Sequence, residues 1–131
     1  MAVQGQIRIG MYGTGNWANK THLPNLKRIA GVSVVAACDQ NAEALSATAT
    51  RFDIPSTYED SHDMLENEDL DVLFLVVPAY ARTDVEITAV QKGVHLFSEK
   101  HQALRLRLAK SIDDAIRSSG VISTVGFRER Y

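Results

Sequence analysis

Short apolar runs alternate with longer amphipathic segments along this chain. The run 72–77 is continuously apolar, as expected for a central parallel strand that is covered on both faces. The other runs are rich in β-branched residues and have the length of strands. Strands are therefore predicted at residues 7–12, 32–38, 72–77, 94–97 and 121–125, with a short, weak one near 56–58.

Helical periodicity fills the intervals between these runs. Residues 42–52 place apolar side chains at steps of three and four, which puts them on one face of a helix. A second stripe covers 104–116. Its first part, 104–108, alternates as a strand would, but the length of the stripe and the stop at Gly120 favour a helix. A third helix is predicted over about 83–92.

Strands that alternate with helices in this way form βαβ units, which require a parallel sheet with right-handed crossovers. All 131 residues are therefore expected to form one Rossmann-like, doubly wound α/β domain with three layers. An apolar fraction of 45% and a charged fraction of 23% are ordinary for a globular protein and exclude a disordered or low-complexity chain. The net charge of −2 gives no indication of nucleic-acid binding or of an anionic membrane partner.

The chain's cysteine content and its N-terminus bear on its location. Cys38 is the only cysteine, so no intrachain disulfide can form and a reducing compartment is favoured. The first six residues lack the basic and apolar regions of a signal peptide. The longest apolar run, 72–81, is far shorter than the roughly twenty residues that span a bilayer. We therefore expect a cytoplasmic protein that does not bind membranes.

The most informative motif is G-x-G-x-x-A, which directly follows the first predicted strand. Gly13 would form the tight turn, Gly15 would let the backbone approach a pyrophosphate, and Ala18 would let a helix pack on the strand. The motif alone is weak, because many strand-to-helix turns carry such glycines for structural reasons. In this context it predicts a dinucleotide site, in which Trp17 contacts either the cofactor or its own domain. The cofactor-binding residues predicted in this loop are Gly13, Thr14, Gly15, Asn16 and Trp17.

Asp39 supplies the acidic partner that this motif requires. It ends the second predicted strand, about two dozen residues beyond Gly15, where a carboxylate can accept hydrogen bonds from an adenosine ribose. The alternative is that Asp39 is only a turn or helix-cap residue. A 2′-phosphate about 4 Å from this carboxylate would be repelled by several kcal/mol at an effective dielectric constant near 20. NAD is therefore predicted in preference to NADP, and Gln40 stands where an NADP site usually offers an arginine.

Several segments together resemble the N-terminal domain of the glucose–fructose oxidoreductase/inositol dehydrogenase (Gfo/Idh/MocA) family. They are the glycine loop with the following 22–24, the stretch 37–39, 76–78, 93–100 and 125–131, which cover nearly the whole chain in order. The pair Glu99-Lys100 after the fifth strand is the most specific of them. The resemblance implies an oxidoreductase that transfers hydride between NAD(P) and a sugar, a polyol or a related hydroxyl or carbonyl substrate.

The resemblance also implies roles for residues after the fourth and fifth strands. Pro78 would line the nicotinamide region, and Glu99 and Lys100 would lie at the nicotinamide ribose. Lys100 would be the catalytic residue of this domain, by hydrogen bonding to a substrate hydroxyl or assisting its proton transfer. Its alternative role is that of a solvated loop lysine.

Two residues depart from the family pattern near the reacting end of the cofactor. Arg82 stands where relatives often have histidine, and His101 stands where they usually have proline. We expect a trans peptide bond between Lys100 and His101, because a cis bond before a residue other than proline costs about 2.5–4 kcal/mol.

Relatives continue into a second domain that supplies most of the substrate pocket. Residues 1–131 are therefore expected to be the cofactor-binding domain, with the C-terminal substrate domain absent from this chain. The chain alone should be inactive, and a small-molecule substrate should bind only to the full-length protein. Its surface should be apolar around Leu106 or Phe127, and homo-oligomer formation stays open.

Three other functions were weighed against this prediction. A stand-alone, non-catalytic nucleotide-binding or interaction module stays open. Methyl transfer from S-adenosylmethionine is disfavoured, because Ile9-Gly10 stand where such enzymes usually carry an acidic residue before the glycine loop. No metal site is predicted, because the four histidines lack an i,i+4 pair.

Overall fold

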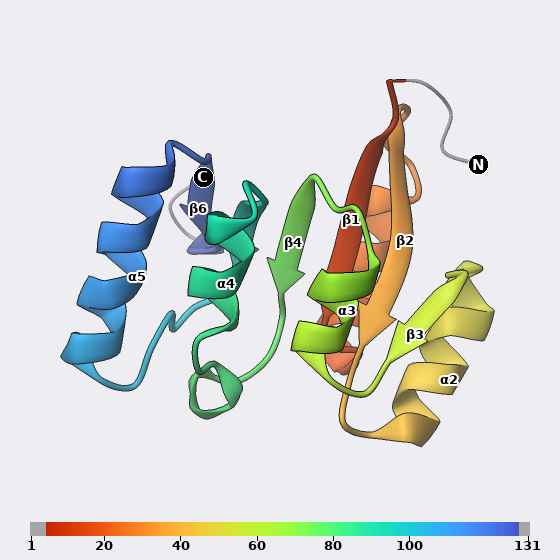
Figure 1. Cartoon of the computed structure of the whole chain (residues 1–131). Helices are drawn as coiled ribbons and strands as arrows, with labels where there is room; N and C mark the ends of the chain where they lie inside the picture. Colours follow the sequence, from red (N-terminus) through yellow and green to blue (C-terminus); the bar gives the residue numbers. More distant parts are fainter. Residues whose placement is uncertain (1–4, 129–131) are drawn as a thin grey trace.

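The computed structural model describes residues 5–128, which form a six-stranded sheet with helices on both faces (Figure 1). The strand order is β3-β2-β1-β4-β5-β6, and each neighbouring pair is parallel. The order reverses between β1 and β4, which is the point where open α/β sheets bind ligands. The strands are β1 (Ile7–Tyr12), β2 (Val32–Cys38), β3 (Ser56–Tyr58), β4 (Val72–Leu75), β5 (His95–Ser98) and β6 (Ser123–Val125).

Every strand is followed or preceded by a helical crossover, and the caps that the sequence supplies set several helix ends. The Asn41 side chain accepts a hydrogen bond from the Ala44 N–H and begins α2, while Asp60 caps α3 in the same way. Gly120, at φ 72°, ends α5. The helical segments are η1 (Ala18–His22), α1 (Leu23–Leu26), α2 (Ala42–Phe52), α3 (Ser61–Asn67), η2 (Ala79–Ala81), α4 (Val85–Gln91) and α5 (Leu106–Ser119).

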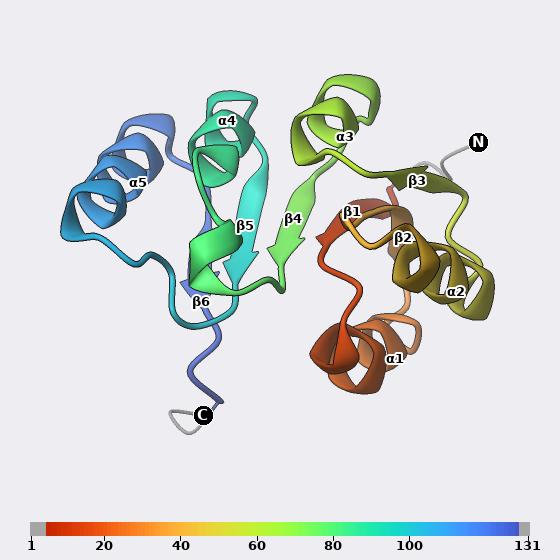
Figure 2. The ribbon, with the colours of Figure 1, turned by 90° about the horizontal axis from the view of Figure 1, so that it is seen from below.

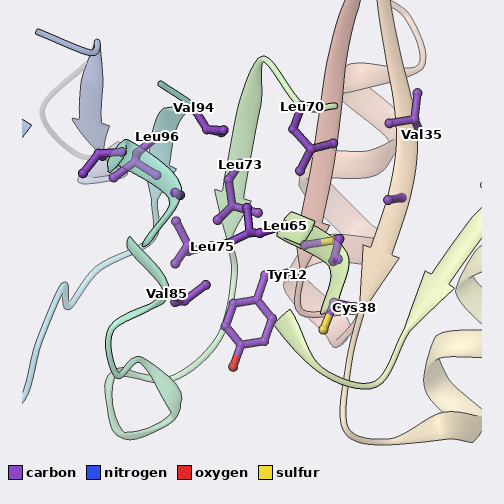
Figure 3. Packing of buried hydrophobic residues seen from close by; sticks show 14 residues of the cluster. Tyr12, Val35, Cys38, Leu65, Leu70, Leu73, Leu75, Val85, Val94 and Leu96 are labelled. Carbon is purple, nitrogen blue, oxygen red and sulfur yellow. The ribbon is translucent and has the colours of Figure 1, made fainter. Parts of the chain in front are cut away.

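Two apolar cores lie on the two faces of the sheet. Successive strand residues point to opposite faces, so a strand that is covered on both sides is apolar at every position. One core joins β4 and β5 to α3 and α4, and its members surround Leu73 and Leu75 (Figure 3). The other joins β1 and β2 to α1 and α2 around Met11. In Figure 2, α1 lies below β1, while α3, α4 and α5 lie above the sheet.

The predicted α/β fold class is confirmed, and β1, β2, β3 and α2 have the predicted bounds. The remaining elements differ at their ends. β4 ends at Leu75 instead of residue 77, because the Val77 carbonyl oxygen turns to accept hydrogen bonds from the Arg82 guanidinium. The segment 104–108, whose alternation could also have indicated a strand, is helical from Leu106. Leu106 and Phe127, around which an apolar surface was expected, are 71% and 46% exposed. β5 is shifted by one residue, β6 and α4 are shorter than predicted, and α5 begins and ends later than the predicted stripe.

Candidate functional site

The glycine loop leaves β1 at the carboxyl edge of the sheet, and its two glycines serve different needs. Gly13 has φ 108°, and a Cβ atom there would collide with the Val76 carbonyl oxygen. At Gly15, a Cβ atom would have no neighbour within 4 Å. Gly13 is therefore required by the fold, whereas Gly15 leaves open space that a ligand can approach.

Asp39 is joined directly to the glycine loop. Its Oδ2 atom accepts hydrogen bonds from the Thr14 N–H at 2.8 Å and from Thr14 Oγ1 at 2.9 Å. Its Oδ1 atom accepts one from the Asn41 N–H at 2.9 Å. The cap of α2 is Asn41 and not Asp39, although the Oδ1 contact does give Asp39 a local turn role. The carboxylate is thus fixed at the end of β2, beside the loop.

Thr14 and Asn19 hold the loop from its inner side. Thr14 is 2% exposed, so its hydroxyl group points to Asp39 and away from solvent. The Asn19 amide nitrogen lies 2.9 Å from the Thr14 carbonyl oxygen and 3.0 Å from that of Gly15. Gly15, Asn16 and Trp17 are exposed. The loop therefore presents these three residues outward, and Thr14 acts by orienting Asp39.

A cleft of about 350 Å³ opens beside the loop at the carboxyl ends of β1, β4 and β5. The strands in Figure 1 point toward this edge, which Figure 2 views from below. Four of the predicted site residues line the cleft, and the other five lie on the neighbouring glycine loop and at the end of β2. The lining residues are Trp17, Val76, Val77, Pro78, Glu99, Lys100 and Arg128.

Polar contacts of Glu99 join the end of β5 to the segment that follows the glycine loop. Its Oε1 atom accepts a hydrogen bond from Trp17 Nε1 at 2.9 Å and lies 2.7 Å from His22 Nε2. The His22 ring packs edge-on against the stacked rings of Phe74 and Phe97, at centroid distances of 5.6 and 5.2 Å. Trp17 therefore contacts its own domain and also lines the cleft, and its contact with the cofactor stays a prediction.

Lys100 and Arg128 bring positive charge to the cleft. Lys100 is exposed and follows the anchored Glu99. The Arg128 guanidinium lies 5.5 Å from the centroid of the Trp17 ring, within the range of a cation–π contact. The cleft therefore combines an aromatic wall with two cationic side chains, which suits a polar or anionic ligand.

The peptide bond between Lys100 and His101 is cis, so the prediction of a trans bond is wrong. That prediction weighed only the preference of an isolated peptide bond. In the fold, contacts on both sides hold this segment. The Glu99 N–H donates to the Leu75 carbonyl oxygen at 2.9 Å, and Gln102 Nε2 donates to Glu86 Oε2 at 3.0 Å.

Arg82 lies behind the cleft and not in it. It is 2% exposed, and its Nη2 atom donates to the carbonyl oxygens of Val77 at 3.1 Å and Leu75 at 3.3 Å. Its Nη1 atom lies 3.8 Å from Oε1 of Glu86, which is fully buried. Burial lowers the pKa of Arg82 and raises that of Glu86, and the attraction between the two charges opposes both shifts.

Sequence reasoning assigned no site role to His22, Arg82, Glu86 or Arg128. His22 belonged to a segment that carried the family resemblance, which was a usable signal. Arg82 and Glu86 are four residues apart, the spacing of an ion pair on a helix. Arg128 also belonged to such a segment, 125–131, but only the fold brings it to Trp17.

Other kinds of site have little support in residues 5–128. No group of three or more His, Cys, Asp or Glu side chains is placed to hold a metal ion in that range. None of the helices described there has the length and apolar character needed to cross a membrane. Burial, with help from Asp60 and Asp39, raises the pKa of Cys38 to about 12, so this thiol is a neutral core group.

Known proteins share this sequence pattern and this fold. Residues 7–127 match the model of the GFO_IDH_MocA family, described as an oxidoreductase family with an NAD-binding Rossmann fold. The chain is 28% identical over 127 residues to scyllo-inositol 2-dehydrogenase (NAD(+)) of Bacillus subtilis, covering 96% of this chain and 37% of that protein. It is 30% identical over 128 residues to inositol 2-dehydrogenase/D-chiro-inositol 3-dehydrogenase of Lacticaseibacillus casei, covering 95% and 37%.

Solved structures agree with these matches. Myo-inositol 2-dehydrogenase from Lactobacillus plantarum superposes with a TM-score of 0.90 at 28% identity, covering 96% of this chain and 38% of that one. Scyllo-inositol dehydrogenase from Lactobacillus casei, solved with bound NAD(H) and scyllo-inositol, gives 0.87 at 26% identity, covering 95% and 37%. The chain therefore spans little more than a third of the length of these proteins.

Proposed function

Since the chain belongs to the Gfo/Idh/MocA oxidoreductase family, we propose that it is the cofactor-binding half of a dehydrogenase acting on a sugar, polyol or related alcohol. The predictions of this family, of its Rossmann fold and of NAD as the cofactor are confirmed. One feature carries the proposed function: the glycine loop, the Pro78 loop and Lys100 meet around one cleft where the strand order reverses.

The described residues fit an NAD molecule laid across this edge. The open space over Gly15 would take the pyrophosphate, and the Asp39 carboxylate would accept hydrogen bonds from the adenosine ribose. Trp17 and Pro78 would form the walls around the nicotinamide end. The charge of Asp39 would disfavour a 2′-phosphate and hence NADP.

Within this arrangement, residues of the chain would prepare the substrate oxygen for reaction. When bound, the nicotinamide ring would supply the redox chemistry by accepting or donating a hydride. The Lys100 ammonium group would donate a hydrogen bond to the substrate oxygen or assist its proton transfer. Glu99, held by Trp17 and His22, would fix the backbone from which Lys100 projects.

We propose that the full-length protein completes the substrate pocket with a second domain. The chain spans 37% of the length of the inositol dehydrogenases that it matches. Precise positioning of reactants contributes about 7–11 kcal/mol to catalysis, so the 131 residues alone should show no appreciable turnover. The substrate would be a small molecule, and the lone reduced Cys38 favours the cytoplasm.

Titration calorimetry with NADH and NADPH tests the binding half of this function. We expect NADH to bind more tightly, and Asp39→Asn to weaken NADH binding about tenfold while narrowing its advantage over NADPH. Asp114→Asn, an exposed residue of α5, serves as the matched control and should change neither affinity. Absence of binding to either nucleotide by folded protein would refute the proposed function, and tighter NADPH binding would refute the role of Asp39.

The catalytic half requires the chain extended to the end of its reading frame. Sugars and polyols are then assayed with NAD by the absorbance of the reduced nicotinamide. Turnover by the extended chain and not by the 131 residues is the expected result. A nucleotide-binding protein that stays inactive in both forms would favour the alternative of a non-catalytic module.

A further inference from the structure

We infer that Arg82, Glu86 and Gln102 form one positioning network, which fixes the relative positions of the two loops on the nicotinamide side of the cleft. One loop, residues 76–82, joins β4 to α4 and carries Pro78. The other, residues 99–105, joins β5 to α5 and carries Lys100. The cofactor role of this network rests on the proposed function, whereas the link between the loops stands on the contacts themselves.

The Arg82 end of the network holds the first loop. All hydrogen bonds of its guanidinium go to the carbonyl oxygens of Leu75 and Val77, at 3.1–3.3 Å. Val77 lines the cleft. On the other side of the loop, the Tyr12 hydroxyl donates to the Ala81 carbonyl oxygen at 3.1 Å. Figure 3 shows this hydroxyl pointing out of the core toward the loop. The loop is thus held from within the protein, and its outer side is left to the cleft.

The Glu86 end holds the second loop. Glu86 is 0% exposed, and its Oε2 atom accepts a hydrogen bond from Gln102 Nε2 at 3.0 Å. Gln102 is two residues beyond Lys100 in the same loop. The other carboxylate oxygen of Glu86 faces Arg82 at 3.8 Å. The buried Glu86 carboxylate therefore lies between Arg82, which holds the Pro78 loop, and Gln102, which belongs to the Lys100 loop.

A role in stability alone explains this arrangement poorly. Burying two charges carries a large desolvation cost, and apolar residues of similar volume often serve stability as well or better. Within the described residues, Arg82 Nη1 and Glu86 Oε1 have no hydrogen-bond partner. A buried pair whose facing atoms stand 3.8 Å apart recovers little of its desolvation cost. What it does provide is a charged link between two loops that are distant in sequence and adjacent at the cleft.

The test uses Gln102→Leu, which cuts the link and leaves the charge pair in place. Gln91→Leu, the same change at an exposed position of α4, is the matched control. NADH spans both halves of the site, whereas ADP lacks both the nicotinamide ring and its ribose. We expect Gln102→Leu to weaken NADH binding about tenfold, the effect of one lost hydrogen bond to a charged group, with ADP affinity kept within about twofold. Gln91→Leu should change neither.

Hydrogen exchange in the nucleotide-free chain gives a second readout. Gln102→Leu alters the loop 99–105. If the two loops are linked, it should also speed amide exchange in the other loop, residues 76–82. A variant with only reduced stability would instead weaken NADH and ADP binding equally and speed exchange throughout the domain. That result, or unchanged NADH affinity and exchange, would overturn the inference.

Two further outcomes separate this inference from the proposed function. If the unaltered chain binds neither nucleotide while exchange in 76–82 still responds, the proposed function fails and the link between the loops stands without its cofactor role. If Gln102→Leu does not fold, the double variant Arg82→Met/Glu86→Leu replaces it, since it removes the network without leaving a buried charge unpaired. The same selective loss of NADH affinity is expected, and equal loss for both ligands would refute it.

Discussion

The two sides of the cleft edge are held by different kinds of interaction. On the β1–β2 side, short hydrogen bonds at the edge of the sheet join Thr14 to Asp39 and Gly13 to Cys38. On the β4–β5 side, the loops are held by Arg82 and Glu86, a charged pair that is closed off from solvent. Among residues 5–128, both Asp39 oxygens on the first side accept hydrogen bonds, whereas Arg82 Nη1 and Glu86 Oε1 on the second side have no hydrogen-bond partner.

Because of this difference, substitutions on one side should affect ligand binding and substitutions on the other should affect stability. Gly15 is exposed and Asp39 is half-buried at the carboxyl edge, so changing them should alter the ligand site and leave the fold intact. Arg82 and Glu86 lie in the interior, where loss of one partner leaves the other charge uncompensated. Substitutions on the adenosine side of the proposed site should therefore lower ligand affinity. Substitutions on the nicotinamide side should lower the stability of the fold and displace the loops.

The largest expected effect is that of Glu86→Ala. It leaves the buried Arg82 without its counter-charge and should lower the free energy of unfolding by about 3–5 kcal/mol. Glu66→Ala is the matched control, because Glu66 pairs with Lys92 at the surface, where an ion pair contributes about 0–1 kcal/mol. Urea unfolding of both variants checks this. Equal losses would mean that Arg82 is solvated and that the two sides of the cleft are alike.

Next in size is the effect of Gly15→Val on the opposite side. The Cβ atom of the new side chain has no protein neighbour within 4 Å, and the side chain occupies the space proposed for the pyrophosphate. NADH affinity should therefore fall about a hundredfold, which corresponds to about 2.7 kcal/mol. The melting temperature should stay near that of the unaltered chain. Gly13→Val should instead destabilise the fold, because its side chain collides with the Val76 backbone. A Gly15→Val variant that fails to fold would show that both glycines serve the turn.

The smallest expected effect is a pH dependence of stability. Burial raises the pKa of Glu86 above its value of 4.5, so between that value and the raised one the folded state keeps a proton that the unfolded state has lost. Stability contributed by Glu86 is therefore complete below pH 4.5 and falls as pH rises through the folded pKa, by at most about 1.4 kcal/mol per pH unit.

Glu86→Gln isolates this contribution, because glutamine does not titrate. The stability of the unaltered chain relative to this variant, from urea unfolding at a series of pH values, should decrease as pH rises from 4 toward neutrality. A difference that grows with pH would mean that the attraction to Arg82 outweighs the desolvation of the Glu86 carboxylate.

The architecture could be predicted from local sequence patterns. The strands β1 and β2 and the helix α2 were predicted with their observed bounds, because apolar periodicity is a local property. The family and the NAD cofactor also followed from short motifs. The roles of the individual site residues stay predictions.

The way in which the nicotinamide side is held depends on contacts between segments that are distant in sequence. Glu99 bonds to His22, 77 residues earlier, and Gln102 bonds to Glu86 across a strand, so neither contact appears in any local pattern. Those long-range contacts also surround the cis bond at Lys100, which local preference alone excluded. Arg82 is a loop residue in the sequence, and the fold buries it against its hydrogen-bond partners, the carbonyl oxygens of Leu75 at the end of β4 and of Val77 just beyond it. Local sequence patterns therefore determine the helices and strands, whereas the packing of distant segments determines where the buried charged side chains lie.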